Sequence, residues 1–296
     1  MRVLITGASG FVGKALVARL LDGGHDVVAV SRSPQRTSEM LGLTDVVEWG
    51  ELTDVFEKGV DAVVHLAGES VQGLWTGGKA QKVSDSRLDC TRQLVEAIRD
   101  SSGRPTVLLS ASGIGFYGEG GERPLDEGAA AGEDFFADLC VRWEAIASEV
   151  ESMGVRVGML RFGIILGPGG GALKAMLLPT NLGIAGPLGG GRQWWSWIAL
   201  SDVVSAIAFA LEHEDISGPI NVVAPEPIRQ AKFQKTLGKI VGRPSFMPAP
   251  AFAVRAILGT FAQEVLSSKR VVPSKLKEAG FTWELDDLQD ALKASL

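Results

Sequence analysis

The sequence predicts an α/β fold in which helices cover both faces of a doubly wound parallel sheet, with a smaller lobe beside it. Apolar strand-like runs alternate with helical patterns through the first 166 residues. These runs are nearly continuous in Val and Leu, which is typical of parallel strands buried between two helix layers. Two glycine-rich segments, 167–171 and 186–191, then interrupt the alternation and predict loops of the second lobe.

The first predicted strand, at 2–5, leads into a glycine triplet and then into a helical pattern. Gly7 would allow the tight turn, Gly10 would let a pyrophosphate approach the backbone, and Gly13 would let the helix pack on its strand. A second strand at 26–30 completes a βαβ unit of the Rossmann type. We therefore interpret the triplet as a dinucleotide phosphate site rather than a glycine-rich turn. The predicted contacts are Gly7, Ser9, Gly10, Phe11, Val12 and Gly13.

The second strand ends in Val30-Ser31-Arg32-Ser33, and no carboxylate follows until Glu39. An acidic residue here usually binds the ribose 2′-hydroxyl of NAD, whereas an arginine can form charge-assisted hydrogen bonds to a 2′-phosphate. We therefore predict NADP(H) as the cofactor, with Arg32 as the phosphate contact and Arg36 as a second candidate. The alternative is that Arg32 is a solvated loop residue.

The rest of the chain divides between the sheet and the lobe. Further strands are predicted at 46–49, 61–66, 106–109 and 155–160, and helices at about 85–100 and 135–153. The predicted domains are an NADP-binding domain at 1–166, rejoined by about 198–224, and a substrate lobe at 167–197 and 225–296, with a helical C-terminal extension at about 247–296. Glycine-rich loops beside such a sheet usually shape the substrate cleft, because ligands bind outside the carboxyl ends of the strands.

Composition argues against several classes of function. The chain has 296 residues, 46% of them hydrophobic, and a net charge of −6 without a basic cluster, so we expect no nucleic-acid partner and no membrane. No apolar run approaches the ~20 residues that span a bilayer. The first strand begins at Arg2 and leaves no room for a signal peptide, so we expect a cytoplasmic location. Cys90 and Cys140 lie in helical patterns and the three histidines lack ligand spacing, so we expect no metal.

Motifs are spread over the whole chain. They are Thr6-Gly7-x-x-Gly10-Phe11-x-Gly13, His65-Leu66-Ala67-Gly68-Glu69, Ser86-Arg87, Gly115-Phe116-Tyr117-Gly118, Trp143-Glu144, Gly186-Pro187-Leu188-Gly189-x-Gly191-x-Gln193, Asn221-x-x-Ala224-Pro225-x-Pro227 and Met247-Pro248-Ala249-Pro250. Together they resemble the extended short-chain dehydrogenase/reductases, and within them the atypical NAD-dependent epimerase-like group that includes the human family 39U proteins.

The resemblance implies an NADP(H)-dependent oxidoreductase or epimerase-like enzyme acting on a small polar substrate, with a nucleotide sugar as one candidate. It also implies cofactor contacts from Leu66, Ala67, Gly68 and Arg87. Arg87 stands where typical members have asparagine, and its charge suits a phosphate or a carboxylate. Relatives often form homodimers through the two helices that begin here near positions 85 and 135, so the resemblance offers these helices as a homodimer interface. The alternative is that their apolar faces pack only on the sheet.

The proton-transfer pair of typical members is missing. They carry Tyr-x-x-x-Lys on the helix after the fifth strand, where lysine lowers the tyrosine pKa and tyrosine exchanges a proton as hydride moves. With Glu144 as the anchor, the tyrosine position becomes Phe136 and the lysine position becomes Cys140. Tyr117 is the only tyrosine, and Gly121 stands four residues after it, so no shifted copy exists.

Three interpretations of this absence stay open. Tyr117 could act as a relocated acid with Ser112 polarising a carbonyl, unless its phenol only packs in a turn. Another donor could have taken over, for which the candidates are Glu69, Lys79, Lys82 and Arg87 unless they are solvated surface charges. The third interpretation is a noncatalytic NADPH-binding sensor or regulator.

Five side chains are candidates for substrate contact: Glu69, Arg161, Gln193, Trp194 and Trp197. Arg161 could bind an anionic substrate, although an internal ion pair accounts for it equally. The tryptophans could stack on a sugar or nucleobase, although core packing or a subunit contact accounts for them equally. Asp202 is interpreted as a helix N-cap.

Overall fold

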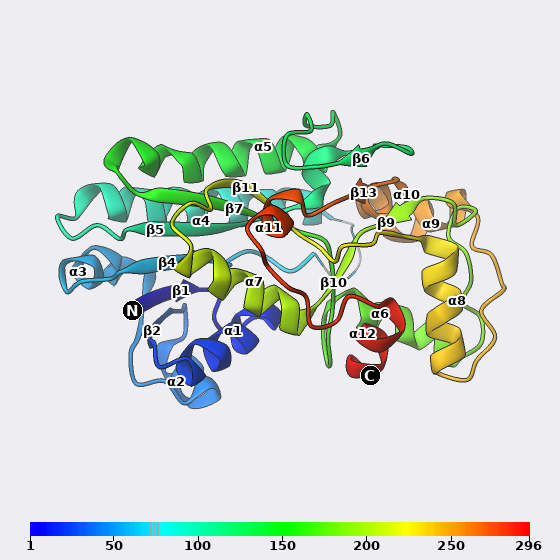
Figure 1. Cartoon of the computed structure of the whole chain (residues 1–296), viewed down its shortest axis with the longest axis horizontal. Coiled ribbons are helices and arrows are strands. Elements are labelled where there is room, and N and C mark those ends of the chain that lie inside the picture. The colour runs from blue at the N-terminus through cyan, green and yellow to red at the C-terminus, as the bar shows by residue number, and fades with distance from the viewer. Residues whose placement is uncertain (72, 74, 76) are drawn as a thin grey trace.

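The computed structural model describes residues 1–71, 73, 75 and 77–296. Its centre is a seven-stranded parallel sheet in the order β11-β7-β5-β4-β1-β2-β3 (Figure 1). From β1 the chain adds strands toward one edge of the sheet, and from β4 it adds them toward the other edge. The strands are β1 (Arg2–Thr6), β2 (Asp26–Val30), β3 (Val46–Val47), β4 (Ala62–His65), β5 (Val107–Gly113), β7 (Arg156–Phe162) and β11 (Gly218–Val222). This order places the carboxyl ends of β1 and β4 next to each other, at the point where doubly wound sheets bind ligands.

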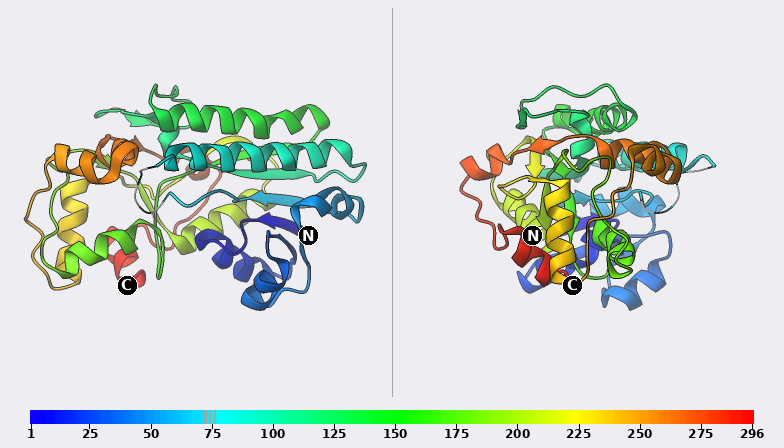
Figure 2. Two further views of the ribbon diagram at one scale, coloured as in Figure 1. Left: turned by 180° about the vertical axis from the view of Figure 1, so that it is seen from behind. Right: turned by 90° about the vertical axis from the view of Figure 1, so that its right-hand side faces the viewer.

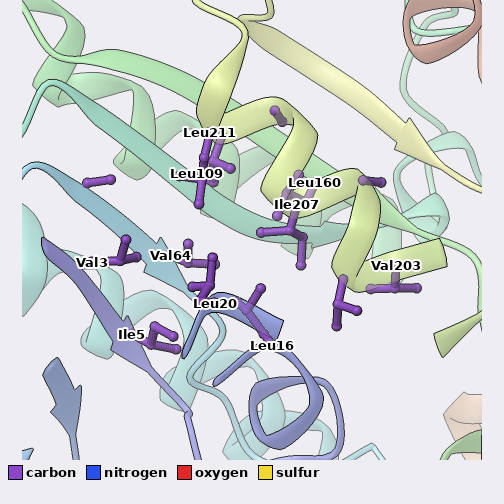
Figure 3. Packing of buried hydrophobic residues seen from close by; sticks show 14 of the residues in the cluster. Val3, Ile5, Leu16, Leu20, Val64, Leu109, Leu160, Val203, Ile207 and Leu211 are labelled. Atoms are coloured by element: carbon purple, nitrogen blue, oxygen red, sulfur yellow. The ribbon is translucent and has the colours of Figure 1, made fainter. Parts of the chain in front are cut away.

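Helices cover both faces of the sheet. One face carries α1 (Phe11–Asp22), α2 (Pro34–Leu41) and α7 (Leu200–Glu212), and the other carries α3 (Leu52–Glu57), α4 (Lys79–Asp100) and α5 (Phe135–Ser148) (Figure 1). Figure 3 shows the first interface, where Leu16 and Leu20 of α1 and Ile207 of α7 pack against Ile5 and Val64 of the sheet. These side chains are almost completely buried, so the sheet is the core between two helix layers.

The smaller lobe lies at one end of the sheet domain (Figure 2). Its helices are α6 (Gly171–Asn181), α8 (Gln230–Ile240), α9 (Ala251–Leu258), α10 (Ala262–Leu266) and α12 (Leu288–Ala294), and α11 (Ser274–Glu278) packs beside β11. Its short strands pair as β8 (Ile164–Leu166) with β10 (Trp197–Ala199), β9 (Trp194–Trp195) with β12 (Ile228–Arg229), and β6 (Pro124–Leu125) with β13 (Arg270–Val271). Trp197, Phe233 and Leu292 lie in its core.

The sequence predicted the fold class correctly. Helix α4 begins at Lys79, six residues before the predicted start at 85, and α5 ends at Ser148 before a 3₁₀ turn reaches Met153. The tryptophan segment contributes the short strands β9 and β10. In the part of the chain that the structure describes, no helix is both long and apolar enough to cross a membrane.

Candidate functional site

The glycine triplet forms a tight backbone cradle at the start of α1. Gly7 has a φ of +72°, and a Cβ there would lie 2.7 Å from the carbonyl of Leu66. A Cβ on Gly13 would lie 2.2 Å from the Gly7 carbonyl oxygen, so α1 can approach β1 only without a side chain at this point. Helix α1 has no capping side chain and no acidic residue in its first turn. Its N-terminus therefore presents amide dipoles suited to an anion.

The first glycine-rich segment closes on this cradle. A Cβ on Gly170 would lie 2.3 Å from Phe11 Cδ2, and a Cβ on Gly171 would lie 2.9 Å from Phe11 Cε1. The ring of Phe11 therefore rests in a notch left by missing side chains. This contact holds the start of α6 against the start of α1, so the predicted phosphate site has the loop of the lobe as a neighbour.

A buried polar network joins β1, β4, α4 and α5 behind the cradle. Thr6 Oγ1 lies 2.7 Å from His65 Nδ1 and accepts from the amides of Leu66 and Ala67. His65 Nε2 lies 2.9 Å from Thr91 Oγ1, which donates to the Arg87 carbonyl. Since each hydroxyl has one proton to donate, the network places the imidazole proton on Nε2. Burial lowers the pKa of His65 to about 3, so the ring is neutral.

The predicted 2′-phosphate contact interacts electrostatically with one predicted substrate contact. Arg32 is exposed after β2, and its charge lowers the pKa of Glu69, although the hydrogen bond from Lys79 lowers it most. Lys79 Nζ lies 2.8 Å from Glu69 Oε1. Two candidates for the missing proton donor are thus paired with each other, and the pairing keeps Glu69 ionised near neutral pH.

Arg87 packs directly beside the β4 loop. Its Nη1 donates to the carbonyls of Glu69 and Val83, both at 3.0 Å, and its guanidinium lies 5.3 Å from the centre of the Trp143 ring. A Cβ on Gly68 would lie 3.3 Å from this side chain. No described carboxylate forms an ion pair with Arg87. The structure therefore offers a cation for an anionic group at this loop.

Ser112 and Tyr117, the predicted catalytic residues, share one network. Ser112 Oγ donates to Glu144 Oε1 at 2.6 Å, and Arg161 donates to both Glu144 oxygens at 2.8 and 2.7 Å. Arg161 Nη1 donates to the Tyr117 hydroxyl at 3.0 Å, and this hydroxyl donates to Asn221 Oδ1 at 2.6 Å. Burial raises the pKa of Tyr117 to about 12. Arg161 is 2% exposed, so of its two alternatives, substrate contact and an internal ion pair, the structure favours the ion pair.

Phe136 and Cys140 stand where the sequence places the lost tyrosine and lysine. Phe136 packs against Trp75 and Phe261, with ring centroids 5.3 and 6.1 Å away, and Trp75 stacks on Phe261 at 5.4 Å. The Cys140 thiol donates to the carbonyl of Gly113, and burial raises its pKa to about 12. An aromatic cluster and a neutral thiol therefore occupy this part of the site.

The other predicted substrate contacts lie in the lobe. Gln193 is buried and donates to the carbonyls of Leu188 and Val265. Trp197 is 1% exposed, so its placement favours the core-packing alternative. Trp194 is half-buried between Arg229 and Arg270, whose guanidinium carbons lie 4.0 and 4.9 Å from its ring centre.

Three roles were missed or misassigned from the sequence. Asp202 is not an N-cap: α7 begins after Ala199, and the buried Asp202 carboxylate accepts from the amides of Glu284 and Leu285. Glu144 served only as an alignment anchor, yet it holds Ser112 and Arg161 together. Glu264 of α10 lies at the end of β5, where a Cβ on Gly115 would be 3.1 Å from its Oε1, and no local sequence pattern indicates this contact.

Comparison with known proteins shows the family. A model described as the NAD dependent epimerase/dehydratase family matches residues 3–223, and one described as a domain of unknown function (DUF1731) matches residues 249–295. The chloroplastic SDR39U1 homolog of Arabidopsis thaliana is 36% identical over 99% of this chain and 86% of its own. Epimerase family protein YfhF of Bacillus subtilis is 35% identical over 99% of this chain and 97% of its own.

A solved structure agrees over the same length. The crystal structure of human SDR39U1 isoform 2 with NADPH has a TM-score of 0.91 and 34% identity, covering 100% of this chain and 99% of that chain. The glycine cradle, the sheet order and these similarities lead to one conclusion: the chain belongs to the NAD dependent epimerase/dehydratase family.

Proposed function

We propose that this protein binds NADP(H) at the carboxyl edge of the sheet and uses it in an oxidoreductase or epimerase-like reaction on a small polar substrate. The observation that carries the proposal is a backbone anion cradle beside an unpaired cation. Helix α1 begins uncapped after Gly10, and Arg32 has no ion-pair partner among the described residues. Human SDR39U1, which aligns from end to end, was solved with NADPH.

The residues present fit this cofactor. The start of α1 packs closely against β1 and the Leu66 carbonyl only because Gly7 and Gly13 carry no Cβ, and the phosphates would lie at the α1 amides with Arg32 on the 2′-phosphate. When bound, the cofactor supplies or accepts the hydride. The chain itself keeps His65 neutral behind the cradle and places Arg87 at the β4 loop, so a cation lies at this loop while the histidine behind the cradle stays uncharged.

The first experiment is a titration with NADPH and NADH that follows energy transfer from the tryptophans. Arg32→Ala should weaken NADPH binding by roughly 10- to 100-fold, the value of a charge-assisted hydrogen bond, and leave NADH binding nearly unchanged. Arg104→Ala is the matched control, because Arg104 is exposed at the opposite, amino edge before β5. Equal losses for both cofactors, or no binding to the wild-type protein, would contradict the assignment.

The second candidate function is a noncatalytic NADPH-binding sensor. Phe136 and Cys140 cannot perform the usual proton transfer, and the Tyr117 hydroxyl is committed to Asn221 and Arg161. A panel of carbonyl compounds and nucleotide sugars, monitored by NADPH absorbance, separates the two functions. Substrate-dependent loss of absorbance supports the enzyme, whereas tight binding without turnover across the panel supports the sensor.

A nucleotide-sugar-like substrate is supported by a surface cavity of the lobe. This cavity has a volume of about 430 Å³ and is lined by Glu122, Gly190, Gly191, Arg192, Arg229, Ala231 and Lys232. Three cations face one carboxylate there, an excess of positive charge that suits phosphate groups. Trp194 lies beside it, stacked on Arg229. Uridine diphosphate should therefore compete with a nucleotide sugar for binding, and Arg192→Ala should weaken the binding of uridine diphosphate.

A further inference from the structure

The C-terminal domain reaches the carboxyl end of β5. Gly115 lies in the 3₁₀ turn that follows β5, and Glu264 lies on α10 of the domain of unknown function. A Cβ on Gly115 would lie 3.1 Å from Glu264 Oε1 and 3.1 Å from Phe136 Cβ. The carboxylate therefore borders Gly115, as does Phe136, the residue at the family's tyrosine position. It lies at the sheet edge where ligands of this fold bind.

The Glu264 carboxylate is held there by a buried cation. Lys269 Nζ lies 3.2 Å from Glu264 Oε1, and the Lys269 side chain is 3% exposed. Glu264 Oε1 is itself buried and receives no hydrogen bond from any residue that the structure describes. The Lys269 ammonium therefore compensates the burial of this oxygen through charge alone, and a titratable group held in this way at a ligand-binding edge is a candidate for function.

Other charged groups face the same place. The charges of Glu264 and Glu144 help burial to raise the pKa of the Cys140 thiol on α5, and Arg87 of α4 interacts electrostatically with that thiol. A carboxylate and an arginine thus both interact with the position that carries lysine in typical members. From its own segment, Glu264 faces Lys269, which also bonds to the Ser267 hydroxyl.

We propose that Glu264, contributed by the C-terminal domain and positioned by Lys269, is the proton-transfer group that replaces the missing tyrosine and lysine. In the oxidising direction, the Glu264 carboxylate takes the proton of the substrate hydroxyl while the hydride of the carbinol carbon passes to NADP⁺, which yields the carbonyl compound, NADPH and the Glu264 carboxyl. Reduction is the reverse. This inference rests on the proposed NADP(H) binding and gives the C-terminal domain a chemical role.

The first test is a binding measurement. The nicotinamide of NADP⁺ is positively charged and that of NADPH is neutral, so a nearby carboxylate favours NADP⁺, while the phosphates contribute equally to both. Glu264→Gln should raise the ratio of the Kd for NADP⁺ to the Kd for NADPH by about tenfold, the order expected for charges ~10 Å apart at an effective dielectric constant of about 20. Glu278→Gln, an exposed carboxylate of the same domain, is the control and should not change it. An unchanged ratio in Glu264→Gln overturns the proposal.

The second test measures the proton step. Protein loaded with NADPH is mixed with 9,10-phenanthrenequinone as a dicarbonyl probe, and cofactor oxidation is followed in a single turnover. Glu264→Gln should slow oxidation by roughly 100-fold or more, whereas Glu278→Gln should not. If Glu264→Gln binds NADPH normally and oxidises it as fast as the wild-type protein, the role of Glu264 is overturned and the proposed NADP(H) binding stands. Failure of the wild-type protein to oxidise bound NADPH overturns the role as well, and failure to bind NADPH overturns the proposed function itself.

A double variant tests whether the loss of rate is caused by misfolding. Glu264→Gln leaves Lys269 buried without its carboxylate, which costs stability. Glu264→Gln with Lys269→Met removes both charges, and its thermal unfolding reports whether the fold is kept. It should show the same loss of single-turnover rate as Glu264→Gln. Normal oxidation by a folded double variant overturns the proposal.

Discussion

Tyr117 is the residue whose role a single substitution can decide. Its hydroxyl donates to Asn221 and accepts from Arg161 inside the protein. Tyr117→Phe leaves both partners unsatisfied, so we expect the free energy of unfolding to fall by about 1–3 kcal/mol in urea denaturation. NADPH affinity should stay within about twofold, because the predicted cradle lies on α1. A fully stable variant that binds NADPH but has lost turnover would instead support Tyr117 as the acid.

His65 gives stability a specific pH dependence. Its pKa is about 3 in the folded protein, against an ordinary value of 6.5, because the ring is buried. Below pH 6.5 the unfolded chain therefore binds a proton that the folded chain does not, and stability falls as the pH falls. Between pH 7 and pH 5 this group alone should cost about 2 kcal/mol.

The contribution of His65 is isolated by a substitution. Urea denaturation of the wild-type protein and of His65→Asn at the two pH values gives four free energies of unfolding. The variant should lose less stability on acidification, by about the 2 kcal/mol assigned to the ring. The same acid sensitivity in both proteins would show that other groups cause it.

At the scale of elements, periodicity predicted what local sequence determines. The strands β1 and β2 were placed almost to the residue, because apolar runs bounded by glycine define them. The start of α4 was not predicted, because residues 79–84 carry several polar side chains. Their helical conformation depends on tertiary contacts such as the Lys79–Glu69 ion pair. Glu264 could not be predicted for the same reason, since only the folded chain brings α10 to β5.

The loop between β8 and α6 should be coupled to α1 through Phe11. Gly170 has an extended backbone with a φ of −154°, so alanine is not strained there, but its Cβ would overlap the Phe11 ring. We expect Gly170→Ala to cost about 1–3 kcal/mol of unfolding free energy and to weaken NADPH binding. Phe11→Leu in the same chain should recover part of both losses.

This double-mutant cycle has a clear control. The φ of Gly50 lies outside the left-handed region, and a Cβ at this position would have no neighbouring atom within 4 Å. Gly50→Ala should therefore change stability by less than about 0.5 kcal/mol. Chemical denaturation and NADPH titration supply both readouts. Strict additivity of Gly170→Ala and Phe11→Leu would show that the two residues are not in contact in solution.

At the scale of the molecule, two sequence modules form one packed unit. Separate family models match residues 3–223 and 249–295, yet the lobe core contains Trp197 from the first and Leu292 from the second. Asn221 donates to the Val272 carbonyl at 2.9 Å, and Trp283 donates to the Val223 carbonyl at 3.0 Å. If Glu264 works at the end of β5, this fastening is what fixes its distance from the sheet.

Asp202 tests whether the two modules unfold together. Its 1% exposed carboxylate on α7 accepts from the amides of Glu284 and Leu285 at 2.8 and 3.1 Å. Asn offers only one acceptor oxygen and brings an NH₂ group toward the second amide, so Asp202→Asn should cost about 1–3 kcal/mol. In a cooperative molecule, the transitions followed by circular dichroism and by tryptophan fluorescence move together to lower denaturant concentration, and both give this loss of unfolding free energy. A separate transition at lower denaturant, seen only by fluorescence, would instead show that the C-terminal segment detaches while the sheet domain remains folded. The position of Glu264 would then depend on the stability of that segment alone.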